Sequence, residues 1–577
     1  MKQLMLGNEA VARGLYEASV KFVSSYPGTP STEITEEVAK YEEIYAEWAP
    51  NEKVAFEAAL GAAMGGGRAF CGMKHVGLNV AADPLFVAGY TGISAGFLIG
   101  VADDPGMHSS QNEQDSRHYA EAAKLPMVEP ANAAECVAYI KEAYRMSEEF
   151  DTPVILRMTT RASHSRSVVE LGEREETEIK AYEKQPQKYI MMPANAKKRH
   201  YVVEEHLAAL RDFAETTALN TVEDNGGEVG IITAGNAYNY AKEVFGNGAS
   251  YLKLGMVFPL PEKKIAEFAA KYETVIVVEE LDPFIETFCK SHGIKVVGKD
   301  VLPLCGEYSD ELLAKLLLGE DPDCTMLGDE IPNRPPVLCP GCPHRGVFYT
   351  LSKLKLRVSG DIGCYTLGAV APLNAIDSVF CMGASISALH GTVKVRGEED
   401  KYVSVIGDST FMHSGMTGLA NVVYNGGNTT TLILDNSITG MTGHQDNPLT
   451  GKTLKGNTAP NLSLEAICAA LGVAPEHIRA VDPNNLPELE KILKEETTAP
   501  CASVIICRRP CALLKGVKRG QPVVINEDKC VGCRACMKIG CPCISIVDKK
   551  AKIDESMCVG CGLCPQMCRV GAICEQE

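Results

Sequence analysis

Short apolar runs alternate along this chain with longer stretches whose apolar positions recur every three or four residues. The first pattern predicts buried strands and the second predicts helices. Near the N-terminus, VKFVSSYPGTPSTEITEEV (residues 20–38) is typical of a strand, a turn and a helix. We expect Thr29 to be the N-cap of this helix, with Pro30 as its first residue and Glu33 in its first turn.

The same alternation returns in later parts of the chain. It is clear in EVGIITAGNAYNYAKEVF (228–245) and TVIVVEELDPF (274–284), and again in KYVSVIGD (401–408) and TTTLILDN (429–436). Alternating strands and helices predict parallel sheets covered by helices on both faces, so the expected fold class is multidomain α/β. A charged, a Pro-rich and a basic connector (171–189, 321–337 and 508–522) separate four expected domains, 1–185, 200–320, 330–515 and 522–577.

Composition narrows the class of protein. A chain of 577 residues is too long for one hydrophobic core, and 45% hydrophobic with 23% charged residues is ordinary for a soluble protein. The net charge of −18 argues against a nucleic-acid partner, which would need basic patches. The most apolar stretch, residues 87–104, is too short and too rich in glycine to cross a membrane. Without a signal segment, the expected location is the cytoplasm.

Cysteines gather in the last fifty residues. CVGCRACMKIGCPC (530–543) and CVGCGLCPQMC (558–568) each contain C-x2-C-x2-C followed by a fourth cysteine. In a chain with no export signal this predicts metal ligation in a reducing compartment rather than disulfides. Closely spaced thiolates suit cubane iron–sulfur clusters, whereas the alternative, a pair of zinc sites, prefers two separated C-x2-C pairs.

The two runs resemble those of two-cluster ferredoxins, in which the fourth cysteine of each run serves the other cluster. The resemblance implies two [4Fe-4S] clusters. One takes Cys530, Cys533, Cys536 and Cys568; the other takes Cys558, Cys561, Cys564 and Cys541. One extra residue precedes Cys541, and Arg569 stands where that pattern has proline. Cys543 and Cys574 are spare, and Cys543 competes with Cys541 as a ligand.

Two polar side chains follow successive strands in the third expected domain. Asp408 ends one strand and Asn436 ends another, 28 positions later, with a helix-length segment between them. Such a βαβ unit has parallel strands, and neighbouring strands lie about 4.8 Å apart. Asp408 and Asn436 are then expected side by side at the carboxyl edge, where hard oxygen ligands suit Mg²⁺ on a diphosphate. The alternative is that both simply terminate strands as turn formers.

This spacing resembles the thiamine diphosphate motif, usually G-D-G followed by N-N, and reads Gly407-Asp408-Ser409 and Asp435-Asn436 in this sequence. The resemblance implies thiamine diphosphate and Mg²⁺ as cofactors, with the backbone carbonyl of Ile438 as a third protein ligand of the metal.

Thiamine enzymes also need a carboxylate against the pyrimidine ring. NEKVAFEAALGAA (51–63) resembles the segment of that family that carries it, which implies that Glu52 activates the cofactor by sharing a proton with a ring nitrogen. The alternative is that Glu52 only favours the start of an Ala-rich helix, with Asn51 as N-cap. Glu57 is a rival for the catalytic carboxylate.

Thiamine and iron–sulfur motifs in one chain resemble the 2-oxoacid:ferredoxin oxidoreductases. YPGTPSTEI (26–34), MKHVGLNVAADP (73–84), DDPGMHSSQNEQDSR (103–117) and CPGCPHRG (339–346) extend the likeness, which is greatest to alpha subunits of the indolepyruvate type. It implies oxidative decarboxylation of aryl pyruvates to acyl-coenzyme A and CO2, with electrons passing to an external ferredoxin. It also implies a smaller beta subunit with a gamma-type domain, in an alpha2beta2 heterotetramer.

Other functions stay open from the sequence. The same chemistry on pyruvate, a branched-chain acid or 2-oxoglutarate is one alternative, and a non-catalytic electron-transfer subunit is another. For the substrate pocket the resemblance suggests Thr29, with Arg117 and His108 as further candidates, although an arginine in a polar run is ordinarily a solvated surface residue.

A third cluster is a further expectation. Cys339 and Cys342 form C-x2-C at the start of the third domain, and Cys364 follows in a Gly-containing turn. Related oxidoreductases hold a cluster near thiamine with such a set. The fourth ligand would be Cys507 or Cys511, and the alternative is that these cysteines are buried small hydrophobes.

Overall fold

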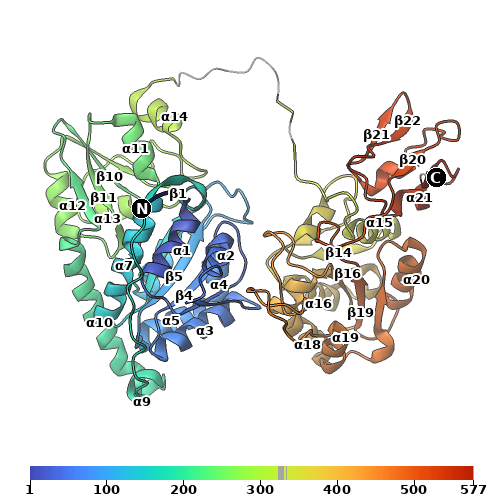
Figure 1. The fold of residues 1–577 in the computed structure, drawn as a ribbon, viewed down its shortest axis with the longest axis horizontal. Coiled ribbons are helices and arrows are strands. Elements are labelled where there is room, and N and C mark those ends of the chain that lie inside the picture. Colours follow the sequence, from blue (N-terminus) through green and yellow to red (C-terminus); the bar gives the residue numbers. More distant parts are fainter. Residues whose placement is uncertain (322–330, 333, 576–577) are drawn as a thin grey trace. The chain divides into compact units, whose positions relative to one another are not determined.

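The computed structural model describes residues 1–321, 331, 332 and 334–575 of the chain. They form two compact units, Met1–Gly328 and Asp329–Glu577 (Figure 1). The Pro-rich segment expected as a boundary at 321–337 lies mostly outside the described residues. The segments 1–185 and 200–320 share the first unit, and 330–515 and 522–577 share the second.

A seven-stranded sheet forms the centre of the first unit. Its order is β12-β6-β7-β5-β4-β2-β3, and every neighbouring pair is parallel except β12 with β6. The strands are β2 (Phe22–Ser25), β3 (Tyr45–Trp48), β4 (Ala69–Lys74), β5 (Phe97–Asp103), β6 (Met127–Val128), β7 (Val154–Thr159) and β12 (Met256–Phe258). Strand β12 comes from the second half of the unit, so the two halves share one sheet.

Helices that cover this sheet are α1 (Gly7–Glu17), α3 (Glu52–Met64), α4 (His75–Val80), α5 (Ala82–Thr91), α6 (Arg117–Ala123), α7 (Ala133–Glu149) and α8 (Thr160–His164). Residues 87–104 therefore divide between helix α5 and strand β5 instead of forming one long segment. No described helix is long and apolar enough to span a membrane. A small antiparallel pair, β1 (Lys2–Leu6) with β8 (Arg166–Glu170), lies beside the sheet (Figure 1).

The first predicted helix starts later than expected. Helix α2 is Thr32–Val38 and its N-cap is Ser31, so the prediction that Thr29 caps it is wrong. The reason is a turn in which both the backbone N–H and the hydroxyl of Ser31 donate to the carbonyl of Gly28, at 2.8 and 2.9 Å. Thr29 and Pro30 lie within that turn and are not available to begin the helix.

The remainder of the first unit is a four-stranded sheet in the order β13-β10-β11-β9. Its strands are β9 (Asn220–Glu223), β10 (Val229–Ala234), β11 (Ser250–Leu254) and β13 (Thr274–Val278). The associated helices are α9 (Pro186–Tyr189), α10 (Pro193–Thr216), α11 (Ala237–Phe245), α12 (Glu262–Ala269), α13 (Phe284–Ser291) and α14 (Asp310–Leu313).

The second unit is built on an all-parallel six-stranded sheet in the order β15-β14-β16-β17-β19-β18. Its strands are β14 (Arg357–Gly360), β15 (Ser378–Val379), β16 (Tyr402–Gly407), β17 (Thr430–Asp435), β18 (Ile478–Val481) and β19 (Ser503–Arg508). Its helices include α15 (His344–Leu354), α16 (Ala384–Arg396), α18 (Met416–Tyr424), α19 (Leu464–Ala470) and α20 (Leu486–Glu496). Strands β16 and β17 are neighbours, with Gly407 opposite Leu434, which confirms the predicted βαβ unit.

The cysteine-rich tail packs against this sheet domain. It contains two antiparallel pairs, β20 (Val523–Ile525) with β23 (Ile573–Glu575) and β21 (Ile544–Val547) with β22 (Lys550–Ile553), and helix α21 (Leu563–Met567). The side-chain amide of Asn484 donates to the carbonyl of Cys561 at 2.9 Å, and that of Gln566 donates to the carbonyl of Asn484 at 2.7 Å. The tail is therefore held to the domain by specific polar contacts.

Candidate active site

The carboxyl edge of the second unit's sheet gathers oxygen atoms. Asp408 follows β16 and Asn436 follows β17, and both side chains are buried. The side-chain amide of Asn436 faces the carbonyl oxygen of Ile438 at 2.7 Å and Oδ1 of Asp408 at 3.3 Å. With the amide oxygen turned inward, the oxygens of Asp408, Asn436 and the Ile438 carbonyl converge, and the backbone N–H of Ile438 donates to the amide oxygen at 3.3 Å. This is the donor set and spacing that a hard, octahedral cation such as Mg²⁺ takes.

Asp408 is poorly satisfied by the protein alone. Its Oδ1 accepts from the N–H of Ser409 at 2.8 Å, while the buried Oδ2 has no hydrogen-bond partner among the described residues. Burial, together with the negative charge of Asp435, raises the pKa of Asp408 to about 8. A bound divalent cation would reverse that effect and keep the carboxylate ionised. The residues therefore fit a metal ion.

Small residues keep this edge open. A side chain at Gly407 would come within 2.6 Å of the Tyr365 ring. The hydroxyl of Ser409 accepts from that of Thr439 at 3.0 Å, which ties the turn after β16 to the loop after β17.

In the first unit, Glu52 is the first residue of helix α3 and is 5% exposed. The side chain of Asn51 accepts from the N–H of Val54 at 2.9 Å, which confirms that Asn51 is the N-cap. Glu52 lies against helix α4, because a Cβ at Gly77 would be 2.6 Å from its Oε1. The glycine thus leaves room for a shielded carboxylate, as protonation of a ring nitrogen requires.

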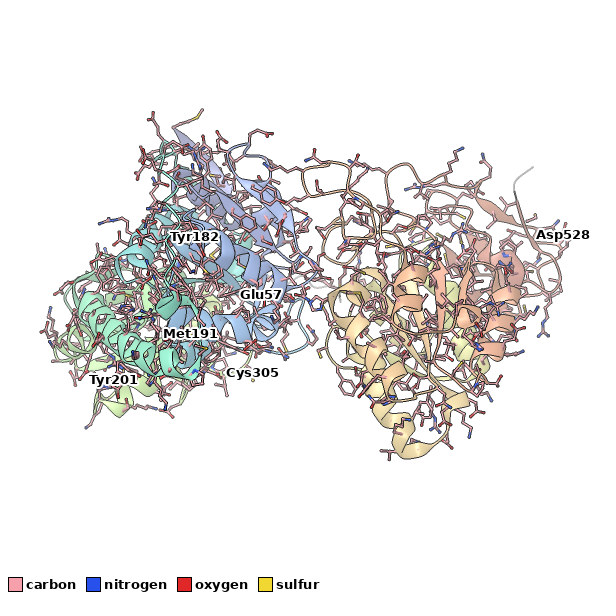
Figure 2. The ribbon with its side chains drawn as sticks, turned by 90° about the horizontal axis from the view of Figure 1, so that it is seen from below. Glu57, Tyr182, Met191, Tyr201, Cys305 and Asp528 are labelled. Atoms are coloured by element: carbon pink, nitrogen blue, oxygen red, sulfur yellow. The ribbon has the colours of Figure 1, made fainter. Side chains whose placement is uncertain are left out.

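Glu57, the rival carboxylate, is in a different environment. It lies one and a half turns further along the same helix, at the surface of the unit (Figure 2). Its side chain is 47% exposed and forms an ion pair with Lys53. An exposed, paired carboxylate is poorly suited to share a proton with a cofactor, so the geometry favours Glu52.

A buried lysine at the carboxyl edge of the first unit's large sheet, near Glu52, was not identified from the sequence. Lys74 ends strand β4 and is 9% exposed, and burial lowers its pKa. Its ammonium donates to the carbonyl of Ser109 at 2.7 Å, its one hydrogen-bond partner among the described residues, and its methylenes lie beneath Gly28. The signal in the sequence was a lysine directly after an apolar, strand-like run, AFCGM.

Next to it, His75 begins helix α4 and is 1% exposed. Its Nε2 lies 3.2 Å from the carbonyl of Asn112, so this nitrogen carries the proton and donates. The other nitrogen, Nδ1, is then a buried acceptor, and it has no partner within the described part of the chain. Lys74 and His75 together hold the loop that follows β5 over the sheet edge.

The structure places Arg117 in a buried ion-pair network. It is 1% exposed and forms ion pairs with Asp115 and Glu279, and it also donates to the carbonyls of Glu280 and Asp282 at 3.0 Å. Its guanidinium thus joins the two halves of the first unit. His108 is half-exposed and lies 3.3 Å from a carboxylate oxygen of Glu307.

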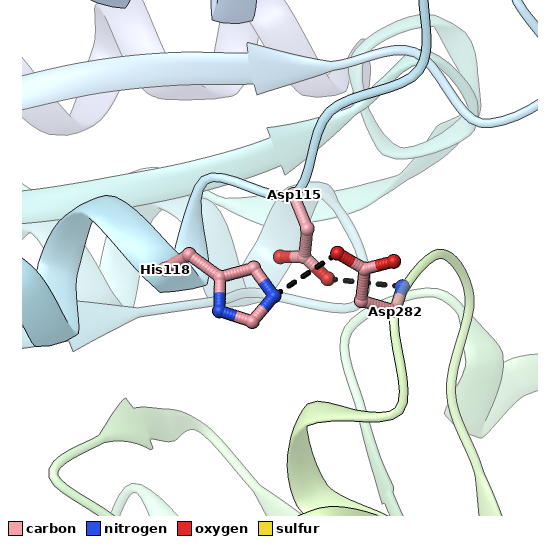
Figure 3. A group of neighbouring side chains, drawn as sticks. All are labelled: Asp115, His118 and Asp282. Carbon is pink, nitrogen blue, oxygen red and sulfur yellow. Dashed lines mark hydrogen bonds and ion pairs between the residues drawn. The ribbon is translucent and has the colours of Figure 1, made fainter.

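Beside Arg117 lies the only group of three His, Cys, Asp or Glu side chains whose ligand atoms gather within 4.8 Å among the described residues: Asp115, His118 and Asp282 (Figure 3). Nε2 of His118 is 3.0 Å from Oδ2 of Asp282, whose backbone N–H donates to Asp115 at 3.3 Å. Arg117 already neutralises Asp115, so the group is an ion-pair network and not a metal site.

Four cysteines come together near the oxygen cluster of the second unit. Burial and the thiols of Cys511 and Cys339 raise the pKa of Cys364 to about 11. Burial raises the pKa of Cys342 to about 12, and Cys364 and Cys339 contribute. A Cβ at Gly440 would lie 3.5 Å from the sulfur of Cys364 and 3.6 Å from the Asn436 side chain.

The structure also distinguishes the two candidates for the fourth ligand. The backbone N–H of Cys511 donates to the carbonyl of Asn436 at 2.9 Å, which places it at the same edge. Cys507 lies in strand β19 inside the hydrophobic core, and burial alone raises its pKa to about 12. The grouping therefore includes Cys511 and excludes Cys507.

Two cavities in the tail are lined by the two expected sets of sulfurs. The cysteines of one cavity are Cys530, Cys533, Cys536 and Cys568. Those of the other are Cys541, Cys543, Cys558, Cys561 and Cys564. The second cavity contains both rivals for one ligand position, since burial and a hydrogen bond with Cys541 raise the pKa of Cys543 to about 12.

The spacing of these sulfurs bears on the choice between zinc and a cluster. Around tetrahedral zinc, Zn–S bonds of about 2.3 Å put the sulfurs roughly 3.8 Å apart. Among the described residues no cysteine trio is gathered that tightly. N–H groups also point at sulfur: Ala572 donates to Cys568 at 3.1 Å, and backbone N–H groups of Ala551 and Gly532 lower the pKa of Cys530. Such donors are typical of iron–sulfur sites.

Comparison with known proteins defines the class. Residues 13–223 match the thiamine diphosphate-binding domain of pyruvate flavodoxin/ferredoxin oxidoreductases, and residues 361–507 match the C-terminal TPP-binding domain of thiamine pyrophosphate enzymes. These matches cover both sheet edges described above. The chain is therefore a thiamine diphosphate-dependent enzyme of the 2-oxoacid:ferredoxin oxidoreductase class.

Whole-chain relatives narrow this further. The chain is 40% identical to indolepyruvate oxidoreductase subunit IorA of Archaeoglobus fulgidus, over 99% of this chain and 97% of that protein. It is 41% identical to the subunit IorA of Thermococcus kodakarensis, over 98% and 96%. The chain belongs to the indolepyruvate oxidoreductase IorA family.

More distant likenesses cover less of the chain. The 2-oxoglutarate synthase subunit KorA of Archaeoglobus fulgidus is 26% identical over 55% of this chain and 99% of its own length. A solved 2-oxoglutarate:ferredoxin oxidoreductase from Magnetococcus marinus is 19% identical, with a TM-score of 0.46 over 55% of this chain and 65% of its own.

Proposed function

We propose that this chain is the catalytic subunit of an enzyme that oxidatively decarboxylates aryl pyruvates such as indolepyruvate to acyl-coenzyme A and CO2. The observation that carries the proposal is the meeting, within one unit, of an oxygen cluster suited to Mg²⁺ with a group of four cysteines. A thiamine enzyme needs the first to hold its cofactor, and only an oxidative one has a use for the second. The names of the whole-chain relatives favour indolepyruvate over other 2-oxoacids.

Each proposed cofactor residue has one task. Asp408, Asn436 and the carbonyl of Ile438 would hold Mg²⁺ on the diphosphate, within the turn formed by Gly407 and Ser409. Glu52 would share a proton with the pyrimidine ring. When bound, thiamine diphosphate supplies the electron sink for loss of CO2.

The substrate acid would be bound through its carboxylate. Lys74 offers a buried cation with spare donors at the edge that also carries Glu52, and a carboxylate is the anion that such a group favours. Thr29 lies beside Gly28, which covers the Lys74 side chain, and its hydroxyl is a further donor for the same acid. His108 is a weaker candidate for binding the acid, since its ring pairs with Glu307.

The cysteines provide a path for electrons. Oxidation of one substrate releases two electrons, and each [4Fe-4S] cluster accepts one at a time. We propose three clusters: one on Cys339, Cys342, Cys364 and Cys511, and one in each tail cavity. They would pass the electrons singly to an external ferredoxin, in the cytoplasm. Either Cys541 or Cys543 completes the second tail set.

A partner chain is part of the proposal. The relatives are named as subunits, and we propose a smaller beta subunit with a gamma-type domain, in an alpha2beta2 heterotetramer. Such a domain would have roughly 200 residues, the size of an ordinary single domain.

The decisive experiment is coenzyme A-dependent reduction of a dye by anaerobically prepared protein, with and without the co-expressed partner. Indolepyruvate, phenylpyruvate, pyruvate, a branched-chain 2-oxoacid and 2-oxoglutarate form the panel. We expect the highest kcat/KM for the aryl acids and low activity without the partner. A preference for 2-oxoglutarate or pyruvate would contradict the proposed aryl substrate. The absence of activity on all five acids would reject the catalytic assignment.

A further inference from the structure

Arg345 is a buried cation between two cysteine groups. It lies in the first turn of helix α15 and is 1% exposed. Its guanidinium donates to the carbonyls of Cys339 at 3.2 Å and Ile539 at 3.0 Å, and also to those of Leu338 and Gly540. One residue thus joins the loop that carries Cys339 to the tail.

None of these partners carries a charge. Within the described part of the chain, every hydrogen-bond acceptor of Arg345 is a backbone carbonyl, and no carboxylate forms an ion pair with it. Burying an unpaired charge costs several kcal/mol unless an opposite charge compensates it, and guanidinium cannot lose its proton to avoid the cost. Arg117 in the first unit shows the usual solution, since two carboxylates flank it.

The missing negative charge has an evident source. Arg345, Pro340 and Gly341 form one wall of the tail cavity that contains Cys541, Cys543, Cys558, Cys561 and Cys564. On its other side Arg345 contacts the Cys339–Cys342 loop, and its charge lowers the pKa of the Cys342 thiol, against the larger effect of burial. A four-thiolate iron–sulfur cluster carries a net negative charge. The N-terminus of α15 adds a partial positive charge at the same place.

We propose that Arg345 is the shared counter-charge of the two cysteine centres that flank it and that it raises the reduction potential of both. A nearby cation stabilises the reduced form of a cluster more than the oxidised form, because the reduced form carries one more electron. This inference rests on the cluster assignments of the proposed function. Arg345 is here a positioning and tuning residue, not a ligand.

The test compares three variants of the full chain with its partner, prepared without oxygen. Arg345→Met removes the charge and the hydrogen bonds, whereas Arg345→Lys keeps the charge but cannot reach all four carbonyls. Arg509→Met is the matched control. Arg509 also acts electrostatically on this cavity, through Cys561, but it is partly exposed and paired with Asp482 at 2.7 Å.

The measurement is a reductive titration followed by electron paramagnetic resonance, with iron content determined on the same samples. At the potential that half-reduces each of the two flanking centres in the wild type, we expect the ratio of reduced to oxidised centre to be at least tenfold lower in Arg345→Met. This corresponds to a fall of about 59 mV for a one-electron couple. Arg345→Lys and Arg509→Met should stay within threefold of the wild type in the ratio of reduced to oxidised centre.

Each outcome decides the matter. If Arg345→Met keeps its full iron content and its reduction potentials equal those of the wild type, the role of Arg345 is wrong while the cluster assignments stand. If Arg345→Lys shifts as much as Arg345→Met, the hydrogen bonds and not the charge matter, and the proposal is also wrong. Should Arg345→Met lose its iron, the midpoint of Arg345→Lys alone decides between charge and hydrogen bonding. Wild-type protein without cluster iron would reject both this proposal and the proposed clusters. The reductant in the titration is dithionite and not the substrate, so a lack of 2-oxoacid activity would not affect the result.

Discussion

The two units both end parallel strands in carboxylates, but they satisfy them differently. In the first unit, Asp104 accepts from the N–H of Ser109 at 2.8 Å and from the hydroxyls of Ser110 and Thr160 at 2.7 and 2.6 Å, so hydrogen bonding lowers its pKa against the effect of burial. In the second, the N–H groups of Ser409, Ser437 and Ile438 lower the pKa of Asp408, but burial and Asp435 outweigh them and raise it to about 8. Its Oδ2 has no hydrogen-bond partner among the described residues. The carboxylate at the first edge is satisfied by the protein, whereas the carboxylate at the second is satisfied only with a cation.

The largest effect is expected from removing the two carboxylates in turn. Asp408→Ala should abolish retention of thiamine diphosphate and Mg²⁺, because it removes the one acidic ligand, and leave the iron of the tail intact. The unloaded variant should be no less stable than the wild type, since an unsatisfied buried carboxylate costs about 1–3 kcal/mol. Asp104→Ala should lose about 2–4 kcal/mol of stability.

Cofactor content, iron analysis and thermal melts with and without Mg²⁺ and thiamine diphosphate check this pair. Full cofactor occupancy in Asp408→Ala would contradict the metal assignment. A cofactor-dependent shift in Tm should persist in Asp104→Ala.

The next effect separates the two carboxylates of helix α3. Glu52→Gln should bind the cofactor normally and lose about 10²–10⁴-fold in kcat, the usual contribution of a positioned proton-transfer group. Glu57→Gln, which changes an exposed side chain paired with Lys53, should leave kcat within twofold. Steady-state kinetics with cofactor binding measured separately tests this. If turnover in Glu52→Gln stays within tenfold of the wild type, another residue must share the proton with the pyrimidine ring.

Iron content distinguishes the two candidate fourth ligands of the proposed third cluster. Three four-iron clusters imply about 12 irons per chain and two imply about 8. Cys511→Ala and Cys342→Ala should each lower the count from about 12 to about 8, whereas Cys507→Ala should not change it. A wild-type count near 8 that Cys342→Ala leaves unchanged would remove the third cluster.

A smaller effect is expected at the first sheet edge. Lys74→Met should raise KM for the 2-oxoacid and lower kcat/KM about 30-fold or more, because losing one partner of a buried charge pair costs about 2–5 kcal/mol. The exposed Lys53→Met serves as the control. Equal loss of kcat at saturating substrate, with KM unchanged, would show that Lys74 supports the fold and not the acid.

The smallest effect is a pH dependence of the second edge. With its folded pKa raised to about 8 above an ordinary 3.8, Asp408 contributes full stability to the unloaded protein below pH 4 and progressively less up to pH 8. Mg²⁺ needs the ionised form, so its affinity should rise by up to tenfold per pH unit to pH 8 and then level off. Calorimetric titration of Mg²⁺ with thiamine diphosphate measures this, and a flat profile between pH 6 and 8 would contradict it.

Sequence reasoning succeeded where chemistry follows a strand directly. The spacing of Asp408 and Asn436 placed both at one edge because neighbouring parallel strands end together. The α/β fold and the grouping of tail cysteines were predictable for the same reason, since their signals are local. The start of helix α2 was not, because the turn on Gly28 competes with the expected cap.

Residues whose role depends on burial were harder to find. Lys74, Arg345 and Arg117 are ordinary cations in the sequence, and only the packing of distant segments makes the first two unpaired and the third fully paired. The choice of Cys511 over Cys507 likewise depends on which of them leaves strand β19. No spacing rule reports such differences.

Strand β12 has a practical consequence for dissecting the molecule. It reaches from the second half of the first unit to pair with β6 at the margin of the large sheet. A fragment that ended near residue 190 would therefore leave β6 with unpaired backbone groups, which promote self-association. Melting should accordingly be a single cooperative event for residues 1–320, and workers who wish to study the N-terminal half in isolation will need to carry both halves together.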